Sequence, residues 1–223
     1  MSEFTFLIGY RHTSSWSLRG WLMMRKTGAP FDEVMIRYRR PEDKAKLRAL
    51  SPAGKVPFLI HERGGRTIKV WDSIAIGEYL AELFPDKRLW PADAEARAMA
   101  RSISAEMHSS FRALRDRLDM NLLGRVEGVR TDDEPVAGEV ARVQEIWTEA
   151  RQRFGEKIGG RYLFGHFTIA DAMYAPVTTR FRTYGVPLSP VAAAYNAAIL
   201  ADPDMVAWED QAKLDPPPEP LAL

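Results

Sequence analysis

The dipeptide Val56-Pro57 constrains the fold more than any other feature of this chain. The residue before a proline is biased towards an extended conformation, and proline has no N–H group, so Pro57 must open a strand rather than lie inside one. The β-rich run 58–60 follows directly. A proline at such a turn is often cis, which would leave the N–H and C=O groups of Val56 facing away from the sheet. Those groups could then pair with the main chain of a bound peptide.

A hairpin and the start of a helix follow this strand. Residues 62–66 predict a hairpin turn, and residues 67–70 predict the return strand. Apolar residues at helical spacing then predict a helix that begins at Asp72-Ser73. The side chains and N–H groups of this pair would lie at the positive end of the helix, where a carboxylate docks readily. The alternative is that the pair only caps the helix.

Strand and helix signals alternate over the first third of the chain. Strand patterns at residues 4–8 and 31–38 flank a helical pattern at residues 18–26, and a short helix is predicted at residues 41–50. Together with the hairpin and the helix after it, the predicted order is β-α-β-α-β-β-α. The first β-α-β unit requires a parallel pair of strands, and the hairpin adds an antiparallel edge.

A linker separates this region from a second one. Residues 84–91 contain two prolines and no periodicity, which predicts a domain boundary. We therefore expect a first domain at residues 1–84, a linker at residues 85–92 and a second domain at residues 93–223.

The second domain is predicted to be entirely helical. Helical patterns cover residues 93–120, 136–154, 191–200 and 203–212. Two capping boxes are predicted, one at residues 131–135 and one in which Thr168 and Asp171 begin a further helix with a buried apolar face. The proline-rich residues 216–220 predict an exposed, extended tail.

The composition excludes several classes of protein. The chain has 223 residues and 46% of them are hydrophobic, so it can form a sizeable core and is not disordered. Its 31 basic and 30 acidic residues give a net charge of +1, unlike a nucleic-acid-binding surface or a polybasic membrane patch. It has no apolar stretch of the roughly 20 residues that span a bilayer, and no features of a signal peptide. We therefore expect a cytoplasmic protein.

The chain contains no cysteine, which excludes disulfides, thiolate metal ligands and a cysteine nucleophile. Any thiol chemistry must therefore use the sulfur of a ligand. No metal site is predicted either, because none of the four histidines is spaced from another as a metal ligand: His12, His61, His108 and His166.

The loop after the first strand carries four hydroxyl groups, those of Thr13, Ser14, Ser15 and Ser17. This loop lies at the carboxyl end of a parallel strand, where open α/β sheets bind ligands. A hydroxyl there can donate a hydrogen bond to an anion while the helix N–H groups supply a favourable field. Together these effects lower the pKa of a bound thiol from about 8.5. The alternative is that Ser14 or Ser15 only caps the helix.

Taken together, these segments resemble the glutathione transferase superfamily over nearly the whole chain. Four motifs carry the resemblance: the serine motif of the zeta class at residues 14–19, the cis-proline turn Lys55-Val56-Pro57, the acid-serine pair Asp72-Ser73, and the capping box at residues 168–171. The resemblance implies an α/β thioredoxin-like N-terminal domain followed by an all-α C-terminal domain, with glutathione as the cofactor.

The resemblance also implies roles for individual residues. Ser14 would donate a hydrogen bond to the glutathione sulfur, with Ser15 as the adjacent candidate. The backbone of Val56, held by Pro57, would pair with the cysteinyl part of the tripeptide. Its two ends would be held by four more residues, the γ-glutamyl group by Asp72 and Ser73 and the glycyl carboxylate by Lys55 and Arg40.

The second substrate is expected between the serine loop and the first long helix of the second domain. Five side chains recur there at helical spacing: Met107, His108, Phe111, Arg112 and Arg115. The alternative is packing in the core or in a dimer, which we favour for at least two of a set of four: Met107, Phe111, Leu114 and Leu118.

Trp16 departs from the zeta motif, which has cysteine at this position. Its bulk beside the thiol would narrow the electrophile site or stack against the substrate, and packing alone is the alternative. The departure speaks against the zeta-type isomerase activity.

The leading hypothesis is a homodimeric glutathione transferase that adds glutathione thiolate to a small-molecule electrophile, with a serine hydroxyl stabilising the thiolate. A glutathione-dependent isomerase of the zeta type is the first alternative. The second is a non-catalytic protein of the same fold that binds a protein partner. No nucleic-acid or membrane partner is expected.

Overall fold

The computed structural model describes residues 2–38 and 40–216. Its first half contains, in chain order, β1 (Phe4–Ile8), α1 (Ser15–Thr27), β2 (Phe31–Met35), α2 (Pro41–Leu50), β3 (Phe58–Arg63), β4 (Arg66–Trp71) and α3 (Ser73–Leu83). This confirms the predicted β-α-β-α-β-β-α order.

The four strands form one mixed sheet in the order β2-β1-β3-β4. β1 pairs with β2 in parallel, whereas β1–β3 and β3–β4 are antiparallel, as the connections require. Gly64 and Gly65 form the tip of the β3–β4 hairpin with φ values of 56° and 74°. Both central positions of such a two-residue turn need a positive φ, which explains the glycine pair.

The prediction that the second strand continues to residue 38 is wrong, because β2 ends at Met35. The N–H group of Ile36 still bonds to the carbonyl oxygen of Ile8, at 2.7 Å. The next N–H group, that of Arg37, bonds instead to the carboxylate of Asp43 on α2, at 2.9 Å. The chain therefore leaves the sheet here and turns into the helix.

The second half is helical, as predicted. After a short 3₁₀ turn at Pro85–Lys87, its helices are α4 (Ala94–Ser109), α5 (Arg112–Arg117), α6 (Val136–Ala150), α7 (Ile169–Tyr184), α8 (Pro190–Leu200) and α9 (Pro203–Leu214). The division of the chain at residues 84 and 93 stays a prediction.

The single long helix predicted at residues 93–120 is wrong, because α4 ends at Ser109 and α5 starts at Arg112. Phe111 lies between them in the left-handed region, with φ of 61°, and its ring is buried. The guanidinium of Arg115 donates to the last carbonyl groups of α4, those of Met107 and His108. Burial of Phe111 and this side-chain cap stabilise the break.

Only one of the two predicted capping boxes forms. At the start of α7, the N–H and hydroxyl groups of Thr168 both donate to the buried carboxylate of Asp171, at 2.8 Å. The box predicted at residues 131–135 is wrong, because Pro135 precedes α6 with no side-chain cap and Asp133 pairs with Arg130 at 2.9 Å. Residues 151–154 were also predicted to continue α6, but the chain forms a π-helical turn at Arg151–Gly155.

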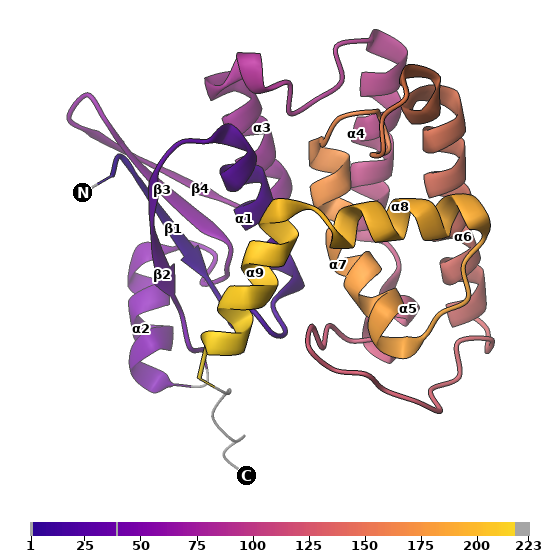
Figure 1. Cartoon of the computed structure of the whole chain (residues 1–223). Helices are drawn as coiled ribbons and strands as arrows, with labels where there is room; N and C mark the ends of the chain where they lie inside the picture. The colour runs from indigo at the N-terminus through magenta and orange to yellow at the C-terminus, as the bar shows by residue number, and fades with distance from the viewer. Residues whose placement is uncertain (1, 39, 217–223) are drawn as a thin grey trace.

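Helices α1 and α3 lie between the sheet and the helices of the second half, and α2 covers the opposite face of the sheet (Figure 1). The larger hydrophobic cluster therefore runs without interruption from β1 through α1 into α4, α6 and α7. A smaller cluster under α2 contains Leu7, Leu47 and Phe58. The two halves share one core.

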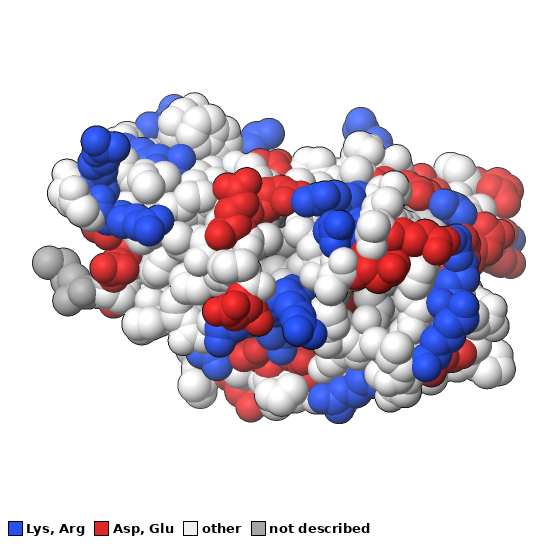
Figure 2. Space-filling model, turned by 90° about the horizontal axis from the view of Figure 1, so that it is seen from above, with Lys and Arg blue, Asp and Glu red and all other residues white. Residues whose placement is uncertain are grey.

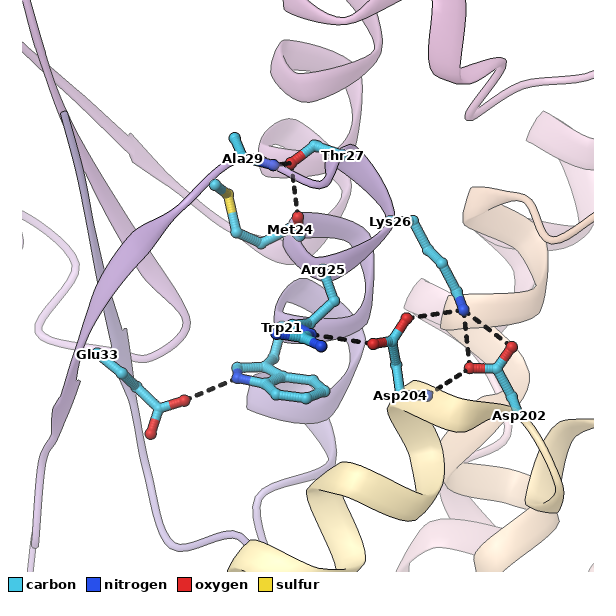
Figure 3. Close-up of polar contacts among 9 residues, drawn as sticks. All are labelled: Trp21, Met24, Arg25, Lys26, Thr27, Ala29, Glu33, Asp202 and Asp204. Atoms are coloured by element: carbon cyan, nitrogen blue, oxygen red, sulfur yellow. Dashed lines mark hydrogen bonds and ion pairs between the residues drawn. The ribbon is translucent and has the colours of Figure 1, made fainter. Parts of the chain in front are cut away.

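Polar contacts fix the end of α1 to the start of α9 (Figure 3). The ammonium of Lys26 bonds to both carboxylate oxygens of Asp202, at 2.7 and 2.8 Å, and pairs with Asp204 at 2.8 Å. Arg25 pairs with Asp204 at 2.9 Å. On the other side of α1, the indole N–H of Trp21 donates to Glu33 on β2 at 2.7 Å. These contacts hold α1 between the sheet and the second half.

Acidic and basic side chains are interspersed on the molecular face seen in Figure 2. No helix within the described residues is long and apolar enough to cross a membrane. Apart from Pro216, the predicted proline-rich tail lies outside the described residues.

Candidate functional site

The start of α1 contributes a chain of hydroxyl groups. Ser14 is the N-cap residue, and its Oγ lies 3.4 Å from the N–H nitrogen of Ser17 and 2.7 Å from the hydroxyl of Ser17. The backbone N–H of Gly9 in turn donates to the Ser17 hydroxyl at 2.9 Å. Ser14 therefore caps the helix, as the alternative reading proposed, and its hydroxyl also lies at the positive end of the helix dipole.

The turn before β3 presents an unpaired stretch of backbone. The Val56–Pro57 peptide bond is cis. Within the residues that the structure describes, neither the N–H nor the C=O group of Val56 makes a hydrogen bond. An extended peptide can use such a donor and acceptor pair.

Asp72 begins α3 in an unusual backbone conformation. Its φ is 74° and its ψ is 136°, a region that non-glycine residues rarely adopt. One carboxylate oxygen accepts from the N–H group of Ile74 at 2.9 Å and so caps the helix. The other lies 3.2 Å from Nε2 of His108 on α4. Asp72 thus caps α3 and links the two halves of the chain.

Two adjoining cavities bring these features together. The Asp72 cavity has a volume of about 430 Å³ and is lined by Trp16, Ala53, Lys55, Val56, Pro57, Trp71, Asp72, Ser73 and His108. The serine cavity has a volume of about 280 Å³ and is lined by Thr13, Ser14, Ser15, Trp16, Tyr38, Lys55 and Val56. Three lining residues are common to both, so the hydroxyl groups, the Val56 backbone and the start of α3 surround one continuous region.

A cluster of guanidinium groups, two from buried arginines and one from the half-buried Arg115, lies behind Trp16. The Cζ atoms of Arg19 and Arg115 lie 4.4 and 5.2 Å from the centre of the Trp16 ring, and the ring of His108 meets it edge-on at 5.2 Å. Arg180 completes the cluster, and in the described part of the chain none of these three arginines forms an ion pair with a carboxylate.

Burial, and then repulsion from Arg115 and Arg180, lower the pKa of Arg19 to about 9. Burial likewise lowers the pKa of Arg180 to about 10, again with repulsion from Arg115. Two nitrogen atoms of Arg19, Nε and Nη1, are buried without a hydrogen-bond partner among the described residues. Carboxylates act on these arginines from a distance, Asp72 on Arg19, Glu139 on Arg115 and Asp119 on Arg180. Burial outweighs their attraction and lowers all three pKa values, so this corner of the site is positive.

Five of the residues proposed for the site lie outside both cavities, and one of them is Arg115 of the arginine cluster. Met107 and Phe111 are buried in the main core, as are Leu114 and Leu118, which agrees with the packing alternative. The side chain of Arg112 pairs with Asp116 and is 92% exposed. It is exposed because the break after Ser109 turns α5 away from the direction of α4. Arg40 precedes α2 and does not line either cavity.

Residue patterns alone did not identify the arginine cluster. Arg19 lies one helical turn after Trp16, and this spacing of three residues was a usable signal that their side chains meet. Arg115 was among the residues expected near the second substrate, but on an uninterrupted helix. Arg180 comes from the middle of α7, so only the tertiary fold reveals that it joins them. Tyr38 and Trp71, which line the cavities, were also missed.

The described residues contain no group of three or more acidic or histidine side chains placed to hold a metal ion. The absence of a metal site from the whole protein stays a prediction.

Comparison with known families identifies the class of protein. The family model for the glutathione S-transferase N-terminal domain matches residues 13–83, and the model for the C-terminal domain matches residues 96–212. The chain belongs to the glutathione S-transferase family.

Its similarity to proteins named as isomerases indicates a zeta-like member of that family. A probable maleylacetoacetate isomerase from Caenorhabditis elegans is 31% identical over 81% of this chain and 80% of its own length. The maleylacetoacetate isomerase of Rattus norvegicus is 25% identical, covering 86% of this chain and 85% of the relative. A maleylpyruvate isomerase from a Ralstonia species is 27% identical, covering 81% and 84% respectively.

Solved structures share the fold at lower identity. A Burkholderia glutathione transferase homologue with bound glutathione is 22% identical, with a TM-score of 0.68 over 96% of this chain and all of its own. Glutathione transferase Omega 2S from Trametes versicolor is 20% identical, with a TM-score of 0.70 over 95% of each chain. Ure2p in complex with glutathione is 15% identical, with a TM-score of 0.67 over 94% of this chain and 95% of its own.

Proposed function

We propose that this protein is a glutathione-dependent isomerase that acts on a small, carboxylate-bearing electrophile with a conjugated cis double bond. Glutathione is the cofactor of the family, and the relatives described above are named as isomerases of maleylacetoacetate or maleylpyruvate. The observation that carries the proposal is the positive cluster behind Trp16, because a substrate with carboxylates needs such a field and a neutral electrophile does not.

The residues of the two cavities fit glutathione. The unpaired N–H and C=O groups of Val56 suit the cysteinyl main chain of the tripeptide. Asp72 and the buried Ser73, at the start of α3, suit the ammonium and carboxylate of the γ-glutamyl group. Lys55 suits the glycyl carboxylate, whereas Arg40 has weaker support because it lies outside both cavities.

Bound glutathione would supply a sulfur nucleophile that adds reversibly to the double bond, permits rotation and is released unchanged. The hydroxyl of Ser14, at the start of α1, would hold this sulfur as a thiolate by donating a hydrogen bond. Ser15 lines the same cavity and is the neighbouring candidate. Arg19 and Arg115 would stabilise the negative charge of the substrate through the field at the cavity wall.

Conjugation is the second candidate function, and Trp16 favours it. The zeta motif has cysteine at this position, whereas here the bulkier indole lines the cavity that contains the serine hydroxyls. A transferase would retain the sulfur adduct as its product, whereas an isomerase would release glutathione. The family resemblance further supports a homodimer and a cytoplasmic location, and we include both in the proposal.

Isomerisation and conjugation differ in whether they consume free glutathione thiol. We would incubate the protein with glutathione and maleylacetoacetate, follow the trans isomer by NMR, and count free thiols with a thiol reagent. Because the chain contains no cysteine, the count reports glutathione alone. Omission of glutathione serves as the control.

We expect the trans isomer to accumulate only with glutathione present and the thiol count to stay constant. Loss of one thiol for each substrate consumed would overturn isomerisation in favour of conjugation. Failure to bind immobilised glutathione, with the fold intact, would overturn both and favour a non-catalytic binding protein.

A further inference from the structure

Ser17 lies behind Ser14 and is closed off from solvent. Its exposed fraction is 0%, and its hydroxyl has two neighbours at hydrogen-bond distance: the backbone N–H of Gly9 at 2.9 Å and the Oγ of Ser14 at 2.7 Å. No other hydrogen bond of this hydroxyl occurs within residues 2–38 and 40–216. Ser17 has no direct contact with glutathione or substrate in the proposed mechanism.

The direction of the Ser14–Ser17 hydrogen bond follows from what each hydroxyl can do. The Oγ of Ser17 accepts from Gly9, which can only donate, so the proton of Ser17 needs an acceptor of its own. Among the described residues, Ser14 Oγ is the acceptor that lies within reach, at 2.7 Å. If Ser14 donated to Ser17 instead, the Ser17 proton would be buried and unpaired, which is the arrangement that folded proteins avoid.

We propose that Ser17 is a positioning residue that donates to Ser14 and thereby turns the Ser14 proton towards the serine cavity. The inference rests on the proposed role of glutathione thiolate. The hydrogen bonds then run in one direction, from the Gly9 amide to Ser17, from Ser17 to Ser14, and from Ser14 to the bound sulfur. Each donor in such a chain is polarised by the one before it, so Ser14 becomes a stronger donor to an anion.

The same geometry distinguishes Ser14 from Ser15. Ser15 lines the serine cavity as well, but its hydroxyl makes no side-chain hydrogen bond in the described part of the chain. It therefore lacks a fixed direction and a polarising neighbour. Residue 9 must also be small for its N–H group to lie this close to the two serines. A Cβ atom at Gly9 would come within 2.6 Å of Tyr38 Cε1 and 3.2 Å of Ser14 Oγ.

The experiment measures the pKa of the bound glutathione thiol from its thiolate absorbance against pH. The wild type is compared with Ser17→Ala, with Ser17→Thr, which keeps a hydroxyl, and with Ser14→Ala and Ser15→Ala. The dissociation constant for glutathione, kcat and KM are each measured on the same proteins. The absence of cysteine again makes the signal specific for glutathione.

We expect Ser17→Ala to raise the thiol pKa by about half a unit to one unit, a roughly three- to tenfold loss of thiolate below that pKa. The substitution weakens the hydrogen bond to the thiolate but leaves the contacts with the peptide unchanged. We therefore expect kcat to fall, whereas the glutathione affinity and KM should change less than about twofold. Ser17→Thr should restore most of the shift. Ser15→Ala should leave the thiol pKa unchanged.

An unchanged thiol pKa in Ser17→Ala, together with a raised one in Ser14→Ala, would overturn the role of Ser17 and leave the proposed function intact. Weak or absent glutathione binding by the wild type would instead overturn the function. If Ser17→Ala fails to fold, a neutron crystal structure of the wild type decides the matter. The deuteron between the two hydroxyls should belong to Ser17, and its attachment to Ser14 would contradict the proposal.

Discussion

Arg19 is a residue at which stability and function make opposite demands. Its guanidinium is buried, lies near two further guanidiniums, and has two nitrogen atoms without partners among the described residues. Desolvation of a charge without an ion-pair partner disfavours folding. Its retention in the core is explained if its positive field is needed by the substrate.

Replacement of this charge should therefore separate stability from activity. We expect Arg19→Met to leave the free energy of unfolding unchanged or to raise it by about 1–3 kcal/mol, because methionine fills similar space without desolvation. The KM for a carboxylate substrate should rise at least about tenfold, equivalent to roughly 1.4 kcal/mol of lost binding. Urea unfolding and steady-state kinetics measure the two effects.

Arg25→Met is the matched control, since Arg25 lies on the same helix, is 46% exposed and pairs with Asp204. Its effect on unfolding should be within about 1 kcal/mol and its effect on KM negligible. A strongly destabilised Arg19→Met protein with unchanged KM would show that the cluster serves folding and not substrate binding.

Asp72 combines two functions that a single substitution can separate. Asparagine caps helices about as well as aspartate does, so Asp72→Asn should change the free energy of unfolding by less than about 1 kcal/mol. It removes the charge proposed to hold the γ-glutamyl ammonium, so the dissociation constant for glutathione should rise about tenfold or more. Calorimetric titration measures the affinity, and equal affinities in the two proteins would exclude a charge-based role.

At the level of residues, short motifs predicted the residues proposed to hold glutathione, and the structure places most of these residues around the two cavities. Ser14, Val56 and Asp72 are defined by local rules for caps, prolines and helix starts, and these rules depend only on neighbours in sequence. The arginine cluster depends on which side chains meet across α1, α5 and α7. A single sequence carries little information on which side chains from distant elements come into contact.

Helix α1 connects the sheet, the site and the second half. Lys26, in its last turn, pairs with the buried carboxylate of Asp202 at the start of α9 (Figure 3). Burial alone would raise the pKa of Asp202, but hydrogen bonds from Lys26 and Tyr162 outweigh it, and the pKa lies below the ordinary value. The ionised form of Asp202 is therefore favoured by folding.

Loss of the Lys26 ammonium should destabilise the protein in a pH-dependent way. We expect Lys26→Met to lower the free energy of unfolding by about 2–4 kcal/mol at pH 7, because a buried carboxylate loses its cation. The folded-state pKa of Asp202 is depressed, so its contribution is complete above the unfolded value of about 3.9 and disappears as the pH falls below it. The difference between the two proteins should therefore shrink below about pH 4.

Urea unfolding at several pH values measures this difference. Arg25→Met, which removes the neighbouring exposed pair, again serves as the control. A difference that stays constant down to pH 2 would show that the Lys26–Asp202 pair is not the cause.

Elements with a clear start were predicted well, and the missed features lack a local signal. The hairpin at Gly64-Gly65 and the start of α7 at Thr168 follow from turn and cap chemistry. The break after Ser109 has neither glycine nor proline, because it forms where Phe111 enters the core and Arg115 caps α4. That choice is made by tertiary packing and overrides local helix propensity.

The molecule as a whole should unfold as one unit, because its main hydrophobic cluster includes β1 and α1 together with α4, α6 and α7. Halves joined by a large apolar interface lose their separate stability. In hydrogen exchange followed by mass spectrometry, the most protected amides of β1 and α7 should report free energies of opening within about 1 kcal/mol of each other. A first half that opens independently at much lower free energy would contradict this view.

The candidate site lies where the two halves meet. There, a carboxylate oxygen of Asp72 from the first half lies 3.2 Å from Nε2 of His108 in the second. The central claim is that glutathione lies along the Val56 backbone with its sulfur at the start of α1. A crystal structure of the complex with glutathione tests it most directly. We expect the sulfur within roughly 3–3.5 Å of the Ser14 hydroxyl and main-chain hydrogen bonds to Val56. A sulfur beyond hydrogen-bonding reach of every hydroxyl in residues 13–17, or a tripeptide bound elsewhere, would contradict the claim.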